Sequence, residues 1–211
     1  MEQTSHLWVF FVMVFGIVLL PGLDMAFILA SSLVGGRAAG LSAVAGIIAG
    51  GLCHVAMGAI GIMTILQLVP AAFNFVLFAG ALYIAWIGVS LLKSDRAFAD
   101  VKQHEARPHL TTFKQGILTN LLNPKAYLFM LAVFPQFLKP QYGVLWIQAL
   151  VLWLIIALTQ AVVYGKVVIA SDRVRLWLRL RPSANIALAR VVGGLLIVTA
   201  VVTGLQGWRG V

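Results

Sequence analysis

The sequence predicts an all-α integral membrane protein whose six transmembrane helices form two inverted three-helix repeats, with the first and fourth helices broken. Three observations lead to this prediction: the composition, six long apolar runs, and the uneven distribution of positive charge between the connections. Of the 211 residues, 62% are hydrophobic and 10% are charged, whereas a soluble globular domain has about 25% charged residues. A soluble fold of this length could not bury so much apolar surface, so we expect lipid to cover it.

Six apolar runs are each long enough for a helix that crosses the hydrocarbon, which takes about 20 residues. The first run contains one charge, Asp24, and the fourth contains Lys114 at its edge and Lys125 well inside. The first run lacks the basic start and the small-residue cleavage site of a signal peptide, so we expect it to be retained. The predicted spans are 7–34, 38–66, 71–92, 113–138, 143–170 and 188–208.

Positive charges divide the connections into two groups, which sets the orientation of the spans. Twelve of the 15 Lys and Arg residues lie in or beside the first, third and fifth connections, while two lie in the fourth connection and the C-terminus. We therefore expect the first group in the cytoplasm and both termini outside, in a multi-pass protein of a bacterial inner membrane. A count of five spans would spoil this asymmetry.

Two helix breaks at matching places indicate an internal repeat. Leu20-Pro21-Gly22 interrupts the first span, and Asn123-Pro124-Lys125 interrupts the fourth, 103 residues later. Because three helices are an odd number, the second copy enters the membrane upside down, as in many secondary transporters. We expect a single domain over residues 1–211, with repeats at about 7–92 and 113–208 and a cytoplasmic linker at 93–112.

The two breaks form the predicted functional site. A proline removes a helical hydrogen bond, and broken backbone inside lipid is tolerated only where it is buried in protein or lines a wet cavity. Beyond each break a half-helix begins, whose N–H groups and dipole can hold a carboxylate. We therefore assign Pro21, Gly22 and Pro124 to the site, with Asn123 as an N-cap. The alternative is a pair of structural kinks.

Two charged residues lie beside the breaks. Asp24 is the only carboxylate in any predicted span, and a charge at mid-membrane costs about 2.5–3.5 kcal/mol on insertion scales. It could exchange protons, hold an ammonium group, or act as a helix-dipole partner. Lys125 could hold a substrate carboxylate, pair with Asp24, or extend to the interface.

Two further polar residues are candidates for the site. His54 lies in the middle of the second span, where it could relay protons or form part of a hydrogen-bonded core. Asn120 lies one turn before Asn123, where it could line the site or satisfy broken backbone.

Other small and polar residues of the spans are interpreted as packing residues. The pair Gly46 and Gly50 is typical of close helix contacts. Gln160 and Tyr164 of the fifth span are assigned to packing unless they face the centre, and Cys53 is interpreted as a small core residue.

The sequence contains no pattern that indicates an enzyme. It has no HExxH, nucleophile elbow or phosphate loop, and its one cysteine precludes an internal disulfide. We expect no catalytic residues, no metal and no cofactor. The net charge of +9 sits between apolar runs rather than on one face of a fold, which argues against nucleic acid as a partner.

These residues resemble the LysE/RhtB family of amino-acid exporters. Pro21-Gly22-Leu23-Asp24 is similar to the family's Pro-Gly-Pro-Asp/Asn signature, and Gly50 to His54 is similar to its Gly-x-x-x-His. Asn123-Pro124-Lys125-Ala126 and Pro135-Gln136-Phe137 match its fourth-helix motifs. The resemblance runs from about residue 8 to 206. Leu23 departs from it by replacing a proline, and Gly51 stands where some members carry an aspartate.

The resemblance implies export of amino acids or close derivatives, commonly driven by proton entry. It leaves open which amino acid is exported, the coupling ion and the oligomeric state, with a homodimer as one option. The expected partners are a small amino-acid-like substrate, protons and the lipid bilayer. The second hypothesis is a channel or cation permease of the inner membrane.

Overall fold

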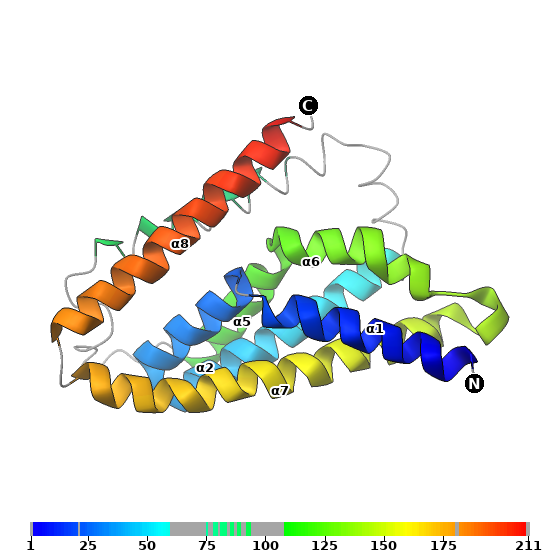
Figure 1. Cartoon of the computed structure of the whole chain (residues 1–211), viewed down its shortest axis with the longest axis horizontal. Helices are drawn as coiled ribbons and strands as arrows, with labels where there is room; N and C mark the ends of the chain where they lie inside the picture. Colours follow the sequence, from blue (N-terminus) through cyan, green and yellow to red (C-terminus); the bar gives the residue numbers. More distant parts are fainter. Residues whose placement is uncertain are drawn as a thin grey trace.

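The structure is a computed structural model that describes residues 2–20, 22–59, 108–179 and 182–209, with twelve further positions between 75 and 93. Pro21, half of the predicted third span and most of the predicted linker lie outside the described residues. Figure 1 shows the arrangement of the labelled elements. In chain order they are α1 (Glu2–Leu19), α2 (Leu23–Ala59), α5 (His109–Leu121), α6 (Pro124–Leu128), η2 (Phe129–Val133), η3 (Phe134–Phe137), η4 (Pro140–Tyr142), α7 (Leu145–Arg179) and α8 (Pro182–Arg209).

Every element in the described ranges is helical, and these ranges contain no β-strand. The predicted all-α class is therefore confirmed. Two stretches are long and apolar enough to cross a membrane, Leu23–Gly58 and Leu145–Ser171, and a third is counted when the bent pair His109–Leu121 and Pro124–Phe137 is taken as one span. The plan of six spans in two inverted repeats stays a prediction.

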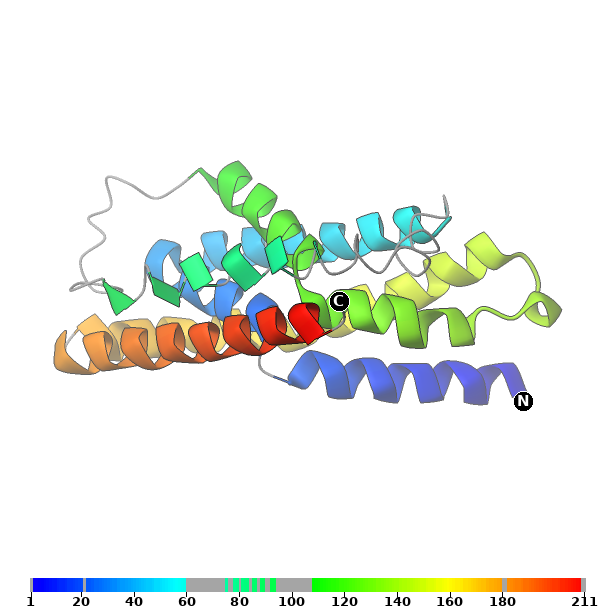
Figure 2. The same ribbon diagram turned by 90° about the horizontal axis from the view of Figure 1, so that it is seen from above.

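Helix α2 consists of two segments that run in opposite directions. Gly36 has φ 74° and ψ −168°, a conformation that is easy for glycine and strained for other residues. The chain reverses there, so that residues 23–35 and 37–59 form neighbouring segments (Figure 1). The first segment continues the direction of α1 across residues 20–22, as both Figure 1 and Figure 2 show.

The chain bends between α5 and α6 by 52°. After α6 it widens into a π-helical turn over Phe129–Val133 and tightens into a 3-10 turn over Phe134–Phe137. Pro135 accounts for this irregularity because it has no N–H to donate to the preceding turn and its ring clashes with that turn. Single π-helical turns of this kind are frequent at functional sites.

The helices before the two breaks pack against the opposite half of the chain. α1 lies against α7, and α5 lies against the second segment of α2. One apolar core joins α1, α2 and α7, and Phe10, Ile47 and Leu152 are almost completely buried in it. Trp153 of α7 donates its ring N–H to the Ile48 carbonyl of α2 at 3.4 Å, which links the two long helices directly.

Glycines allow α5 to approach the second segment of α2, as the spacing of Gly46 and Gly50 predicts. A Cβ atom on Gly46 would collide with the Phe113 carbonyl oxygen, and one on Gly50 would lie 2.8 Å from the Asn120 Cβ. On the facing helix, a Cβ on Gly116 would lie 2.8 Å from a carbonyl oxygen of α2. The small residues therefore set the distance between the backbones of α2 and α5.

Helix α8 and the described positions between 75 and 93 lie on one side of this bundle, and α8 contacts α2 and α7 (Figure 1). They pack on each other at Gly88, where an added Cβ would lie 2.9 Å from the Gly193 carbonyl oxygen. Leu196 of α8 contacts Leu23 at the start of α2.

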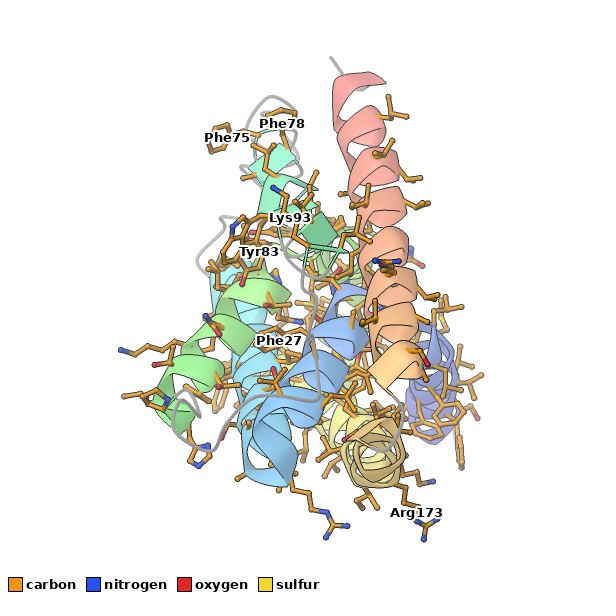
Figure 3. All side chains as sticks on the ribbon, turned by 90° about the vertical axis from the view of Figure 1, so that its left-hand side faces the viewer. Phe27, Phe75, Phe78, Tyr83, Lys93 and Arg173 are labelled. Carbon is orange, nitrogen blue, oxygen red and sulfur yellow. The ribbon has the colours of Figure 1, made fainter. Side chains whose placement is uncertain are left out.

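Phe75 and Phe78 are exposed and point away from the bundle (Figure 3). Large exposed apolar groups of this kind mark surfaces that contact a membrane or another protein.

We expect Gly46→Ala to lower the free energy of unfolding by about 1–3 kcal/mol, the usual cost of overpacking a tight interface. The cause is that the new methyl group meets backbone, which cannot move away as a side chain can. Thermal unfolding in detergent measures the change. Gly51→Ala is the matched control, because its Cβ would lie 3.6 Å from the Trp153 ring nitrogen, an ordinary contact. Equal melting temperatures for the two variants would contradict the packing argument.

Candidate functional site

A cavity of about 60 Å³ lies where α1, α2, α5, α6 and α7 meet at the two breaks. One water needs about 10–15 Å³, so the cavity has room for several. Its polar lining comes from four predicted site residues and two that were assigned to packing. These six residues are Asp24, His54, Asn120, Lys125, Gln160 and Tyr164. Its apolar lining includes Val14, Ile17, Val18, Phe129, Met130 and Ile156.

Asp24 lies in the first turn of α2, and its side chain is only 3% exposed. Its Oδ2 accepts a hydrogen bond from the Asn120 side-chain amide at 3.2 Å, while its Oδ1 has no hydrogen-bond partner among the described residues. A carboxylate normally accepts several hydrogen bonds. Oδ1 accepts no hydrogen bond from the described residues, although the side-chain amide of Asn123, whose Nδ2 is also unpartnered, interacts with the carboxylate.

Lys125 reaches across from the second break to the first. Its ammonium group donates hydrogen bonds to the carbonyl oxygens of Ile17 at 3.1 Å and Leu20 at 3.0 Å. These carbonyls belong to the C-terminal end of α1, where the freed acceptors and the negative end of the helix dipole favour a cation. Gly22 lies beside the same ammonium group, since a Cβ on it would be 3.3 Å from the Lys125 Nζ.

Lys125 makes no direct ion pair with Asp24 in the part of the chain that the structure describes. Its charge is compensated by the carbonyls of α1, and Asp24 is held by an amide instead. The two charges still face one cavity. The sequence offered three roles for Lys125: a salt bridge with Asp24, a substrate carboxylate, or extension to the interface. The described residues show a fourth, because its ammonium group binds the carbonyls of α1.

The start of α6 satisfies its own backbone. Asn123 is the N-cap: its Oδ1 accepts from the Lys125 N–H at 3.1 Å, and Pro124 follows at the first helical position. The next two N–H groups, of Ala126 and Tyr127, donate to the Asn123 carbonyl. The capping role that the Asn-Pro pair predicts is therefore present. Asn123 and Pro124 are buried beside the cavity rather than in its lining.

Asn120 and His54 connect α5 to α2 next to the break between α5 and α6. The Asn120 carbonyl accepts from the Asn123 N–H at 3.0 Å and lies 3.3 Å from His54 Nε2. Because a carbonyl only accepts, Nε2 carries the proton and Nδ1 is left as an acceptor. The His54 ring also packs edge-on against the Tyr127 ring, with 4.7 Å between the centroids. His54 is thus a buried, fixed residue in the wall of the cavity.

Four polar atoms of the cavity residues are buried and lack a hydrogen-bond partner among the described residues. They are Asp24 Oδ1, His54 Nδ1, Asn120 Oδ1 and Gln160 Oε1. All four are acceptors in the arrangement described above. An unsatisfied buried polar group costs about 1–3 kcal/mol, so such a group of acceptors is complementary to a donor-rich guest: water, an ammonium group or another cation.

Sequence reasoning assigned Gln160 and Tyr164 to packing, but both line the cavity. With Ile156 they lie four residues apart on α7, so one face of that helix forms a wall. The spacing of four residues predicts that these side chains share one face of the helix, but it does not predict that this face is turned toward the cavity.

Of the predicted site residues, Pro21 lies outside the described residues. In the described ranges no three His, Cys, Asp or Glu side chains are clustered as metal ligands.

A second cavity, of about 210 Å³, lies at the end of the molecule that holds the N-terminus. His6 of α1 packs there against the rings of Phe137 and Tyr142, at centroid distances of 4.7 and 5.5 Å. Gln148 at the start of α7 holds the connector by three hydrogen bonds, two of them to the Lys139 backbone. The N-terminus and the connector between η3 and α7 therefore share one end of the molecule (Figure 1).

Comparison with known proteins places this chain among transporters. The family of LysE type translocators matches residues 14–207. An uncharacterized membrane protein of Pseudomonas aeruginosa is 30% identical over 198 residues, 92% of each chain. The leucine efflux protein of an Enterobacter species is 32% identical over 138 residues, 63% of this chain and 64% of that protein. The homoserine/homoserine lactone efflux protein of Salmonella typhimurium is 29% identical over 177 residues, 83% and 84% of the two chains. No solved structure matches the chain.

We expect Lys125→Met to lower the free energy of unfolding by about 1–3 kcal/mol, because it leaves the carbonyls of Ile17 and Leu20 without their donor. Thermal unfolding in detergent measures this loss. Lys114→Met on the exposed face of α5 is the control, and its effect should stay within about 0.5 kcal/mol. A Lys125→Met protein as stable as the Lys114→Met protein would show that the bonds to α1 contribute nothing.

Proposed function

Because the chain belongs to the LysE family of translocators, we propose that it exports amino acids or close derivatives from the cytoplasm in exchange for protons. Two relatives are named as efflux proteins, one for leucine and one for homoserine and homoserine lactone. The structural observation that carries the proposal is the group of four unpaired acceptors around one cavity. The α-ammonium group of an amino acid supplies three donors and a positive charge to such a site.

Asp24 is the proposed partner of that ammonium group. Its Oδ1 is open, and Asn120 holds the carboxylate in place through Oδ2. A proton and an ammonium group would compete for the same carboxylate. Such competition is sufficient for antiport, because the substrate leaves when the proton arrives. His54, with its open Nδ1 in the same cavity, is the proposed proton relay.

The substrate carboxylate is proposed to bind at the breaks. Lys125 lines the cavity and has three N–H donors, of which two are used by the carbonyls of α1. Its third donor is available for a carboxylate. Asn123, Pro124, Pro21 and Gly22 then act by shaping the breaks that position this lysine. The N–H groups at the start of α6 are already bonded, which favours Lys125 over that helix end.

We propose the inverted-repeat plan, with repeats at about 7–92 and 113–208, as the basis of alternating access. The packing supports it: α1 precedes the first break and lies on α7, and α5 precedes the second break and lies on the second segment of α2. Each broken helix thus packs on the second helix of the other repeat. Rocking of these two pairs would open the cavity to one side at a time.

The proposed location is the bacterial inner membrane, with the odd-numbered connections in the cytoplasm and both termini outside. This orientation requires the N-terminus and the connector after η3 to lie on the same side of the membrane, and both lie at the same end of the molecule. An acceptor-lined cavity is also compatible with a cation permease, the second candidate. The two differ in that only the permease carries current without an amino-acid gradient.

We expect Asp24→Asn to abolish proton-driven efflux while leaving the protein folded, because an amide keeps the bond to Asn120 but cannot exchange a proton. The measurement is amino-acid transport by proteoliposomes under an imposed pH gradient. Asp100→Asn in the predicted linker is the control and should transport like the unmodified protein. Normal proton-driven transport by the Asp24→Asn variant would rule out Asp24 as the coupling site, and a cation current without amino acid would favour the permease.

A further inference from the structure

We propose that the cavity selects amino acids whose side chains carry no charge, and that Gln160 is the residue on which this selection depends. This inference rests on the proposed function, and it adds the class of substrate and a residue that determines it. Three observations carry it: the count of charges around the cavity, the apolar wall that α1, η2 and α7 contribute, and the unpartnered amide oxygen of Gln160 in the lining.

The charges of the cavity match those of a zwitterion. Among the described residues that line it, Asp24 is the only acid and Lys125 the only lysine or arginine. An amino acid with a neutral side chain brings one ammonium and one carboxylate, so each charge finds an opposite partner. Lysine or arginine brings a second cation for which the lining offers no second carboxylate. A buried charge without a partner is strongly disfavoured.

Apolar side chains line the cavity beside its two charges. They come from three separate elements, with Val14 on α1, Met130 on η2 and Ile156 on α7. Helices α1 and α7 run inward from the end that holds the N-terminus and the connector after η3, and η2 runs out toward that end (Figure 1). An amino acid whose charged groups bind Asp24 and Lys125 would thus place its side chain against this apolar wall.

Gln160 is a polar residue of the same lining. It follows Ile156 and precedes Tyr164 on the cavity face of α7, it is 6% exposed, and its Oε1 has no hydrogen-bond partner among the described residues. Its amide is a polar but uncharged group beside the path of the substrate side chain. A glutamate at this position would have nearly the same shape and would supply the second carboxylate that a basic side chain needs.

The first test measures efflux of leucine, homoserine, lysine and glutamate from proteoliposomes that contain the full chain. We expect leucine and homoserine to be transported, and lysine and glutamate to be slower by about a hundredfold, which corresponds to the cost of one unpaired charge in a membrane interior. If lysine moves as fast as leucine, this inference is overturned while amino-acid export stands. If none of the four is transported, the proposed function itself fails.

The second test changes Gln160 alone. Gln160→Glu should raise lysine transport at least tenfold relative to leucine, while Gln160→Met, of similar size and without charge, should leave lysine slow. Thermal unfolding of both variants in detergent checks that they fold. A folded Gln160→Glu protein that still rejects lysine overturns the role of Gln160, as does a Gln160→Met protein that accepts it.

Discussion

The hydrogen bonds from the Lys125 ammonium to the carbonyls of Ile17 and Leu20 hold the two helix breaks together. Inside lipid, carbonyls freed at a helix end have no water to bind, so each break needs a donor from elsewhere in the protein. Here the second break supplies that donor to the first. One side chain thus satisfies the backbone, neutralises the dipole of α1 and joins segments that are more than a hundred residues apart in sequence.

This use of Lys125 explains why Asp24 remains open. A buried carboxylate beside a buried lysine would ordinarily form an ion pair, which closes both groups to a ligand. Because the carbonyls of α1 compensate the lysine, Asp24 forms no ion pair with it. Asn120 holds the carboxylate through Oδ2, the Asn123 amide also interacts with it, and Oδ1 has no hydrogen-bond partner among the described residues. The glycines of the α2–α5 interface bring Asn120 close enough to do this, since a side chain at Gly50 would displace it.

The sequence is sufficient to predict the helical class and the N-cap at Asn123, because composition and local capping are properties of short segments. Isolated polar groups in apolar runs also drew attention to Asp24, His54, Asn120 and Lys125, which line one cavity; their role in function stays a prediction. It is not sufficient to predict which acceptors Lys125 binds or that Gln160 and Tyr164 face the cavity. Those facts depend on how α1 and α7 are rotated against the breaks, which packing decides. The π-helical turn before Pro135, by contrast, has a local cause, because the proline has no N–H to donate to that turn.

The same lysine limits how the cavity can open. If α1 moves together with α6, the bonds to Ile17 and Leu20 persist, and the two breaks act as one body that slides against α2 and α7. If α1 instead moves with α7 and away from α6, as the proposed rocking requires, both bonds break. The ammonium group is then released toward a bound carboxylate or toward Asp24, the only acid among the described residues that line the cavity. The second route costs two charge-assisted hydrogen bonds, about 1.5–3 kcal/mol each, unless a ligand replaces them. A substrate carboxylate would therefore lower the barrier to the motion that releases the substrate, whereas an empty site would stay closed. Coupled transport requires this difference between the loaded and the empty site.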